Sequence, residues 1–197
     1  MFSERQRKLN ASGAVQQGDR TFSELIELLP QDDAVWMAHA AQHLAGCSDL
    51  KLRDPARAVE LGRRAVALPM TDQNQLAGTW ACLGVALEGA GRRAEAEEPY
   101  RQATAIWKRL SDQEPGNEWY RHERAYFSLS IANVLRAAGR NEAALEPCRL
   151  GVQLDERLAA DFPTHLEHAE RLRQARSLLK TLLSSLGRSE EAAQIAR

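Results

Sequence analysis

Cysteine is scarce in this chain, with three residues in 197, at Cys47, Cys82 and Cys148. The three thiols are widely spaced and include no Cys-x-x-Cys pair. An odd, sparse set is typical of reduced cysteines in a cytosolic protein and argues against a disulfide framework or a zinc site built from thiolates. Because Cys82 and Cys148 fall among apolar helical residues, we expect them to be small buried hydrophobic residues and not nucleophiles.

The chain also lacks a charge excess and a long apolar run. Lys and Arg number 26 and Asp and Glu number 27, which gives a net charge of −1. Dedicated binders of nucleic acid or anionic membrane normally carry a basic excess. No stretch approaches the roughly 18 apolar residues of a membrane span, and no apolar segment of a secretory signal follows the polar start. We therefore expect no nucleic acid or membrane as partner, and a cytoplasmic location.

Residues that favour β-strands are few, since Val and Ile together number eleven while Ala and Leu are abundant. Ala and Leu are strong helix formers, and strands are enriched in β-branched residues. This balance disfavours a sheet-based enzyme fold and predicts an all-α protein.

A repeat is visible in three segments that begin with Gly-Arg, at Gly91, Gly139 and Gly187, each 48 residues after the last. Two pairs of prolines share this spacing, namely Pro99 with Pro147 and Pro115 with Pro163. A divergent earlier copy covers residues 54–61, where Asp54 and Pro55 form an expected helix start. A fixed period of this length indicates an array of supersecondary units.

Each repeat has the pattern of two helices. Trp80, Leu83 and Leu87 precede the first glycine at the spacing of one helical face. The glycine stands where a helix C-terminus needs a left-handed residue. A second amphipathic run then leads to Pro115 or Pro163, where the helix ends. Its apolar positions in one copy are Ala96, Tyr100, Ala103 and Trp107.

Small residues at matched points would let the paired helices approach closely, as at Gly84, Ala132, Ala58, Ala96 and Ala144. Pro99 and Pro147 fall inside the second helix, where we expect a tolerated bend on the convex face. Thr164 and Glu167 have the spacing of a capping box at a helix start.

These residues resemble the tetratricopeptide repeat (TPR) family over roughly residues 18–197. The matching positions in one copy are Trp80, Leu83, Gly84, Ala96, Tyr100 and Ala103. The resemblance implies a right-handed helical-hairpin solenoid of about four repeats. The period of 48 residues exceeds the usual 34 of the family, which about two extra turns in each helix would explain. Long arrays of this kind are similar to the tails of bacterial Ser/Thr kinases.

The expected organisation is a polar tail or frayed helix over residues 1–17, a partial repeat over 18–30, and four hairpins. The hairpins are expected near residues 34–68, 72–114, 117–162 and 164–197. The last helix, from Ser189 to Arg197, is short and is followed by no polar capping helix. Either this helix suffices to cover the last apolar face, or the C-terminal repeat mediates self-association.

No catalytic constellation is visible, and we expect no enzyme activity and no cofactor. Asp161-Phe162-Pro163 shares two letters with the metal-binding motif of kinases but lacks its glycine and ends a helix. His39 and His43 have the spacing of two metal ligands on one helix, but no third ligand is evident. His165 and His168, three residues apart, are weaker candidates, and we expect no metal.

The resemblance implies that the first helix of each repeat lines a concave binding surface. Projecting the inner positions of the family onto this chain gives Tyr126, Leu129, Asn133 and Arg136 in one repeat and Gln174, Ser177 and Thr181 in the following one. All of these except Thr181, together with Arg173 of a basic cluster, are the predicted partner contacts. Ala81, Val85 and Glu88 come from the preceding repeat. Asn133 and Arg136 resemble part of the carboxylate clamp of TPR chaperone adaptors, but Leu129 replaces its lysine. The basic residues at 171, 173 and 176 either mark a solvated face or bind an acidic peptide.

The resulting hypothesis is a non-catalytic interaction module that binds a peptide or helix of a partner protein in its concave groove. The alternative is a regulatory or oligomerisation segment that belongs to a bacterial Ser/Thr kinase system.

Overall fold

The computed structural model describes residues 32–46 and 53–195, and every regular element within these ranges is an α-helix, which confirms the all-α prediction. The helices are α3 (Ala34–Gly46), α4 (Pro55–Ala67), α5 (Gln73–Gly89), α6 (Arg93–Gln113), α7 (Glu118–Ala137), α8 (Asn141–Asp161), α9 (Leu166–Ser185) and α10 (Ser189–Gln194). The predicted tail, the partial repeat at 18–30 and Cys47 lie outside the described residues. Among the described helices, none combines the length and apolar character that crossing a bilayer requires.

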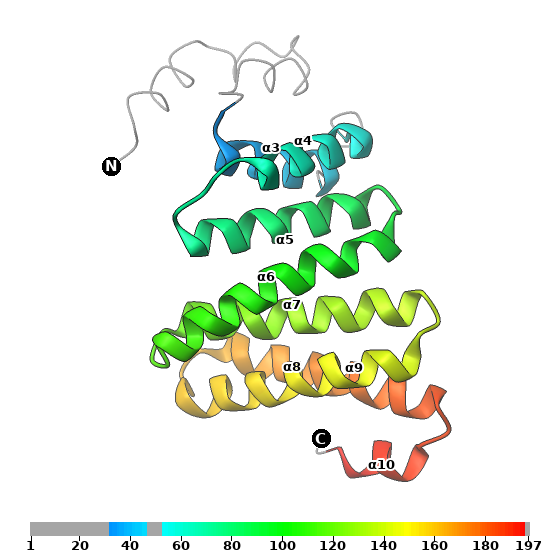
Figure 1. The fold of residues 1–197 in the computed structure, drawn as a ribbon. Coiled ribbons are helices and arrows are strands. Elements are labelled where there is room, and N and C mark those ends of the chain that lie inside the picture. Colours follow the sequence, from blue (N-terminus) through cyan, green and yellow to red (C-terminus); the bar gives the residue numbers. More distant parts are fainter. Residues whose placement is uncertain (1–31, 47–52, 196–197) are drawn as a thin grey trace, which may run out of the picture.

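The helices pack in chain order, and α3 and α10 lie at opposite ends of the stack (Figure 1). Each helix from α4 onward packs against the next one, and α3 packs against both α4 and α5. In the described part of the chain, α5 and α7 pack against each other far less than each packs against α6. The second helix of one pair therefore separates two successive first helices.

The same turn closes three of the pairs. Gly91, Gly139 and Gly187 have φ angles of 73°, 74° and 73°, the left-handed region that was predicted for them. The next residue donates its backbone N–H to a leucine carbonyl five residues back, at 2.8, 2.9 and 2.9 Å. This bond is the 6→1 bond of the Schellman motif, which satisfies a carbonyl that the helix end leaves free.

The helix starts were predicted with mixed success. Asp54 caps α4 as expected, since its Oδ1 accepts the N–H of Arg57 at 3.0 Å and Pro55 occupies the first turn. The capping box of Thr164 and Glu167 is wrong, because the N-cap of α9 is His165 and no side chain caps that end. Thr164 therefore lies one residue too early, and Glu167 is not held by a backbone N–H.

The prolines inside the second helices are buried. Pro99 lies within α6 and Pro147 within α8, so neither helix begins at its proline. Both rings are shielded from solvent. Burial of the ring offsets part of the cost of the hydrogen bond that an interior proline removes.

Small residues bring α5 and α6 into close contact. A Cβ added to Gly84 would lie 2.3 Å from Cε1 of Tyr100, so the ring occupies the space that glycine leaves. The Tyr100 hydroxyl donates to Oε2 of Glu88 at 2.6 Å, which fixes the ring. The other small residues at matched points, Ala58, Ala96, Ala132 and Ala144, are fully buried. One core cluster extends from α3 to α10.

Candidate functional site

The first helices of three successive pairs line a cavity of about 420 Å³. The cavity lies between α5 and α7, which α6 separates, and it is also lined by α3 and by Trp107 of α6. We call this space the α3–α5–α7 groove. Its side chains include His39 and Gln42 from α3, Asn74 and Val85 from α5, Trp107 from α6, and Trp119, Glu123 and Phe127 from α7.

The floor of the groove is aromatic and tightly held. The Trp107 ring is 2% exposed and stacks on Phe127 with 5.2 Å between centroids and 16° between planes. Its indole N–H donates to Oδ1 of Asn74 at 3.0 Å, which joins α6 to α5. Tyr100 also packs against Phe127, with 5.3 Å between the ring centroids. Side chains held in this way lose little freedom when a ligand binds.

The rim of the groove carries an exposed tryptophan and one carboxylate. Trp119 is 56% exposed and stacks on His122, with 6.0 Å between centroids. Glu123 is the acidic residue of the lining, and no Lys or Arg is present among the described lining residues. A large exposed aromatic side chain beside a hollow is typical of an interaction site.

The thiol beside the groove is not reactive. Burial first and Glu123 second raise the pKa of Cys82 to about 11, so the thiol stays protonated near neutral pH. Burial raises the pKa of Cys148 to about 12. Both residues are buried, as predicted from their apolar neighbours. A nucleophilic cysteine would need the opposite shift.

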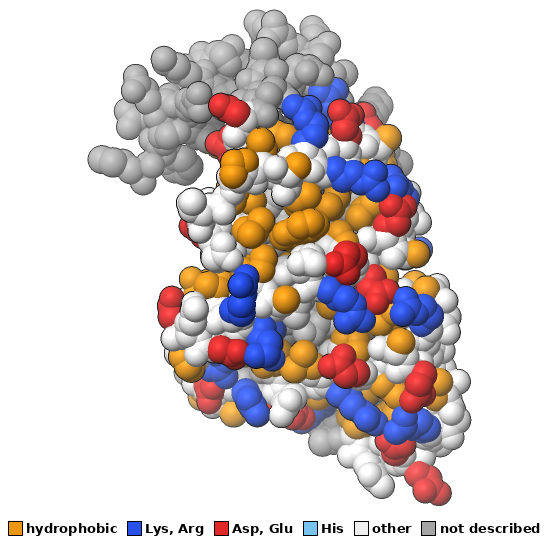
Figure 2. All heavy atoms as spheres, viewed as in Figure 1, with side chains coloured by type: hydrophobic (Ala, Val, Ile, Leu, Met, Phe, Trp, Pro, Cys, Tyr) orange, Lys and Arg blue, Asp and Glu red, His pale blue; other side chains and the backbone are white. Residues whose placement is uncertain are grey.

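One face of the molecule is shown in Figure 2. Apolar side chains gather on its upper half, over α3 to α5, while Arg or Lys and Asp or Glu are interspersed over the lower half.

None of the seven residues predicted to contact a partner is among the described residues that line this groove. Tyr126 is half exposed and lies under the guanidinium of Arg171, whose Cζ is 5.8 Å from the ring centroid. Leu129 packs against α8, where its Cγ would be 2.6 Å from a Cβ added to Gly151. Asn133 and Arg136 are exposed near the end of α7.

The predicted residues of α9 lie at a second hollow. Arg173 and Ser177 line a cavity of about 580 Å³ between α8 and α9, and Gln174 bonds to Glu170 at 2.8 Å. The predicted residues of α9 therefore lie apart from the predicted residues of α7, which do not line this second hollow. The three arginines of the basic cluster already have carboxylate partners, namely Asp155 for Arg171, Glu170 for Arg173 and Glu156 for Arg176.

Sequence reasoning found part of the groove and missed its outer part. Ala81 and Val85, which were projected onto the inner surface, do line it. Trp119, Glu123 and Phe127 were not predicted, although their spacing of four residues places them on one helical face. Trp119 and Glu123 lie in the first turns of α7, in the region by which these helices exceed the family pattern.

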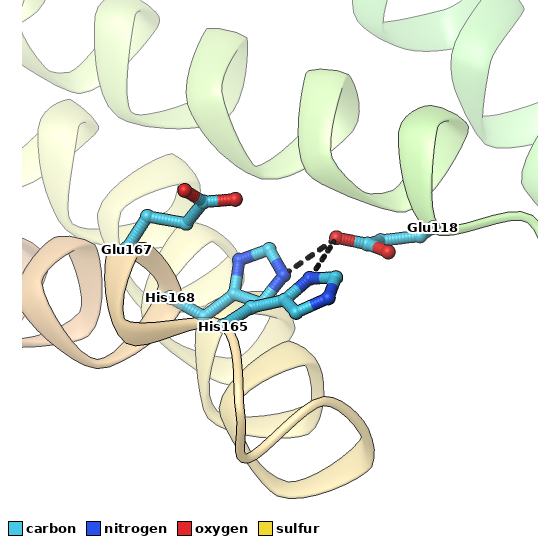
Figure 3. A group of neighbouring side chains, drawn as sticks. All are labelled: Glu118, His165, Glu167 and His168. Carbon is cyan, nitrogen blue, oxygen red and sulfur yellow. Dashed lines mark hydrogen bonds and ion pairs between the residues drawn. The ribbon is translucent and has the colours of Figure 1, made fainter.

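A second cluster joins the start of α7 to the start of α9 (Figure 3). Glu118, His165, Glu167 and His168 offer ligand atoms that all lie within 4.8 Å of one another. The hydrogen bond from His165 is the main cause that lowers the pKa of Glu118. On the sequence alone, the pair of His165 and His168 ranked below His39 and His43, and Glu118 lies 47 residues before His165 in the chain. His39 instead lines the groove.

Comparison with known proteins identifies no family for this chain. No family model matches the chain, and no curated protein matches it. Among solved structures, a crystal structure of BtubC (BKLC) from P. vanneervenii is similar at a TM-score of 0.45 and 16% identity. The match covers 99% of this chain and 89% of the other.

Proposed function

We propose that this chain is a TPR-like, right-handed helical-hairpin solenoid that acts as a non-catalytic protein interaction module. Its ligand is a peptide or helix of a partner protein, bound in the α3–α5–α7 groove. The observation that carries this proposal is the cavity itself. Its walls come from the first helices of three successive pairs, and its floor is formed by the stacked rings of Trp107 and Phe127. Repeat arrays use such extended surfaces for binding.

Ion pairs between successive second helices support the repeat interpretation. Arg63 of α4 pairs with Glu95 of α6 at 3.0 Å, and Glu97 of α6 pairs with Arg140 at the start of α8, at 2.7 Å. Arg149 of α8 pairs with α10 through Glu191, at 3.0 Å. Each unit thus contacts its neighbour in a similar way, as a stacked array requires.

The chemistry of the groove specifies the class of peptide. Trp119, Phe127 and Val85 offer an apolar surface for an aliphatic or aromatic side chain. Glu123, whose Oε1 lies 3.0 Å from Nδ1 of His122, offers its other carboxylate oxygen to a Lys or Arg of the ligand. Pairing of opposite charges sets orientation and suppresses wrong partners. A free peptide carboxylate finds no lysine or arginine in the described lining. The ligand is therefore a segment with an apolar anchor and a nearby basic residue.

The test starts from a peptide display library selected on the whole protein. A selected peptide is labelled, and its affinity is measured by fluorescence anisotropy for the wild type and two variants. The groove variant is Trp119→Ala/Glu123→Gln. The matched control is Tyr126→Ala/Asn133→Ala/Arg136→Ala, which changes exposed or half-exposed residues of the same helix outside the groove. Circular dichroism checks that both variants keep their helical content.

We expect the groove variant to lose about tenfold to 100-fold in affinity, the range that truncation of one interfacial hot spot produces. The control variant keeps the affinity of the wild type. The reverse pattern would move the binding surface to the outer side of α7 and contradict the groove assignment. Selected peptides that are predominantly acidic would contradict the proposed ligand chemistry.

A further inference from the structure

We propose that Glu118, His165, Glu167 and His168 form a Zn²⁺ site that joins the first turn of α7 to the first turn of α9. The ion would link two successive helical pairs, because Glu118 and the other three residues belong to different pairs. This inference is independent of the groove and of any peptide ligand.

Three donor atoms of the site already converge. Nδ1 of His165 and Nε2 of His168 lie 3.0 and 2.8 Å from the same oxygen, Oε1 of Glu118 (Figure 3). Bonds of about 2.0–2.1 Å to a tetrahedral zinc ion place neighbouring ligand atoms about 3.3 Å apart. The nitrogen–oxygen separations therefore need to lengthen by a few tenths of an ångström to admit the ion.

Glu167 supplies the fourth ligand. Its side chain is exposed, it caps no helix, and its carboxylate belongs to the same group within 4.8 Å. Two imidazoles and two carboxylates are a donor set that suits zinc. Two carboxylates also balance the charge of a divalent cation and outweigh the partial positive charge of the two helix N-termini.

His168 is the anchor of the site. Its side chain is 1% exposed, and Nδ1 has no hydrogen-bond partner among the described residues. That nitrogen would carry the ring proton when Nε2 binds a metal, without a protein acceptor among the described residues. The rings of Phe162 and His165 pack beside it, with centroids 5.9 and 5.6 Å away. A ring held in this way presents Nε2 in one direction, which lowers the cost of ordering a ligand.

The cluster is not a consequence of repeat packing. At the preceding junction, 48 residues earlier, the four matched positions are Met70, Asn117, Trp119 and Tyr120. These side chains include no imidazole and no carboxylate, yet α5, α6 and α7 pack there as the later helices do. The histidines and glutamates are therefore specific to the junction of α7 with α9.

Neighbouring charges do not oppose the site directly. Arg121, one turn along α7, pairs with Asp161, and Arg171 on α9 pairs with Asp155 at 3.1 Å. His122 is held by Glu123 at 3.0 Å. The arginines that border the cluster thus already have carboxylate partners, and the carboxylates of Glu118 and Glu167 remain to face a metal.

The experiment titrates the full chain, freed of metal by a chelator, with Zn²⁺ alone by isothermal titration calorimetry. The starting protein is His39→Ala/His43→Ala, which removes the other closely spaced histidine pair. Co²⁺ replaces Zn²⁺ in a parallel titration, because its visible absorption is strong in a tetrahedral site and weak in an octahedral one. Three variants in this background are compared: His165→Ala, Glu118→Gln and the control His122→Gln.

We expect one Zn²⁺ per chain and a tetrahedral Co²⁺ spectrum, both retained in His122→Gln. His165 is 43% exposed, so its removal perturbs the fold little, and circular dichroism verifies this. His165→Ala and Glu118→Gln should each weaken binding by at least ~100-fold, since losing even an outer partner of a metal ligand costs 10–100-fold. Absence of stoichiometric binding, equal affinity in His165→Ala, or an octahedral Co²⁺ spectrum would overturn the proposal.

Discussion

The close contact between Gly84 of α5 and the Tyr100 ring of α6 can be tested by adding one methyl group at Gly84. Gly84→Ala places a Cβ 2.3, 2.5 and 2.9 Å from three ring atoms of Tyr100. Ordinary contacts begin near 3.4 Å, so the ring must move by about 1 Å. The ring is 1% exposed and its hydroxyl is bonded to Glu88, which leaves little room for that movement.

The magnitude follows from two opposing effects on the free energy of unfolding. Overpacking a well-packed core costs about 1–3 kcal/mol. Alanine in place of glycine within a helix returns about 0.5–1 kcal/mol. We therefore expect Gly84→Ala to destabilise the protein by ~1–2 kcal/mol. Gly78→Ala is the matched control in the same helix, because no atom lies within 4 Å of its added Cβ, and it should stabilise by about 0.5–1 kcal/mol.

The assay is urea unfolding followed by circular dichroism and tryptophan fluorescence. A second background makes this test more specific. The positions 48 residues after Gly84 and Tyr100 hold Ala132 and Cys148, so the next repeat combines an alanine with a cysteine at the matched positions. In Tyr100→Cys the ring is gone, and Gly84→Ala should become neutral or stabilising, with a coupling of ~2 kcal/mol between the two sites. Equal effects of Gly84→Ala and Gly78→Ala in the wild-type background would refute the close approach.

Three further predictions concern the turn, a buried carboxyl and the thiols. Gly139→Ala should cost about 1 kcal/mol of unfolding free energy in urea, because alanine is strained at φ 74°; an unchanged midpoint would contradict this. Burial raises the pKa of the Asp155 carboxyl in spite of Arg171. The protonated carboxyl therefore contributes its full stabilisation below the ordinary pKa of 3.8, and this contribution is lost as the pH rises through the raised pKa. Asp155→Asn should thus gain stability relative to the wild type as the pH rises above 3.8 in urea titrations, and a constant difference would argue against the shift. Cys82 and Cys148 should react with Ellman's reagent only after denaturant is added, since both are buried with raised pKa values; rapid labelling of either in native protein would contradict that burial.

Local features of the fold could be predicted from the sequence because they depend on residues close together in the chain. The glycine turns, the Asp54 cap and the ends before Pro115 and Pro163 are set by short-range sterics and hydrogen bonds. The Thr164 capping box failed because α9 starts one residue later, with His165 as its N-cap, so that Glu167 stands at the second helical position and not at the third. Burial of Pro99 also depends on the neighbouring helices, which the local pattern does not describe.

The candidate sites were harder to predict because they depend on contacts between helices. The family pattern projects one stripe of each first helix toward a partner, and it placed Ala81 and Val85 correctly at the groove. It does not describe the extra turns that hold Trp119 and Glu123. Glu118 meets His165 and His168 across 47 and 50 residues, and no local spacing reveals that encounter.

The measurement that tests the proposed function most directly is the response of the four tryptophan indole N–H signals to a selected peptide. Trp107 and Trp119 line the groove, whereas Trp36 and Trp80 do not appear in its described lining. Two-dimensional ¹⁵N–¹H NMR, with signals assigned by single Trp→Phe variants, reports all four at once. The groove assignment predicts that saturating peptide shifts the signals of Trp107 and Trp119 and leaves those of Trp36 and Trp80 in place. Bound peptide that leaves the Trp107 and Trp119 signals unmoved would contradict it.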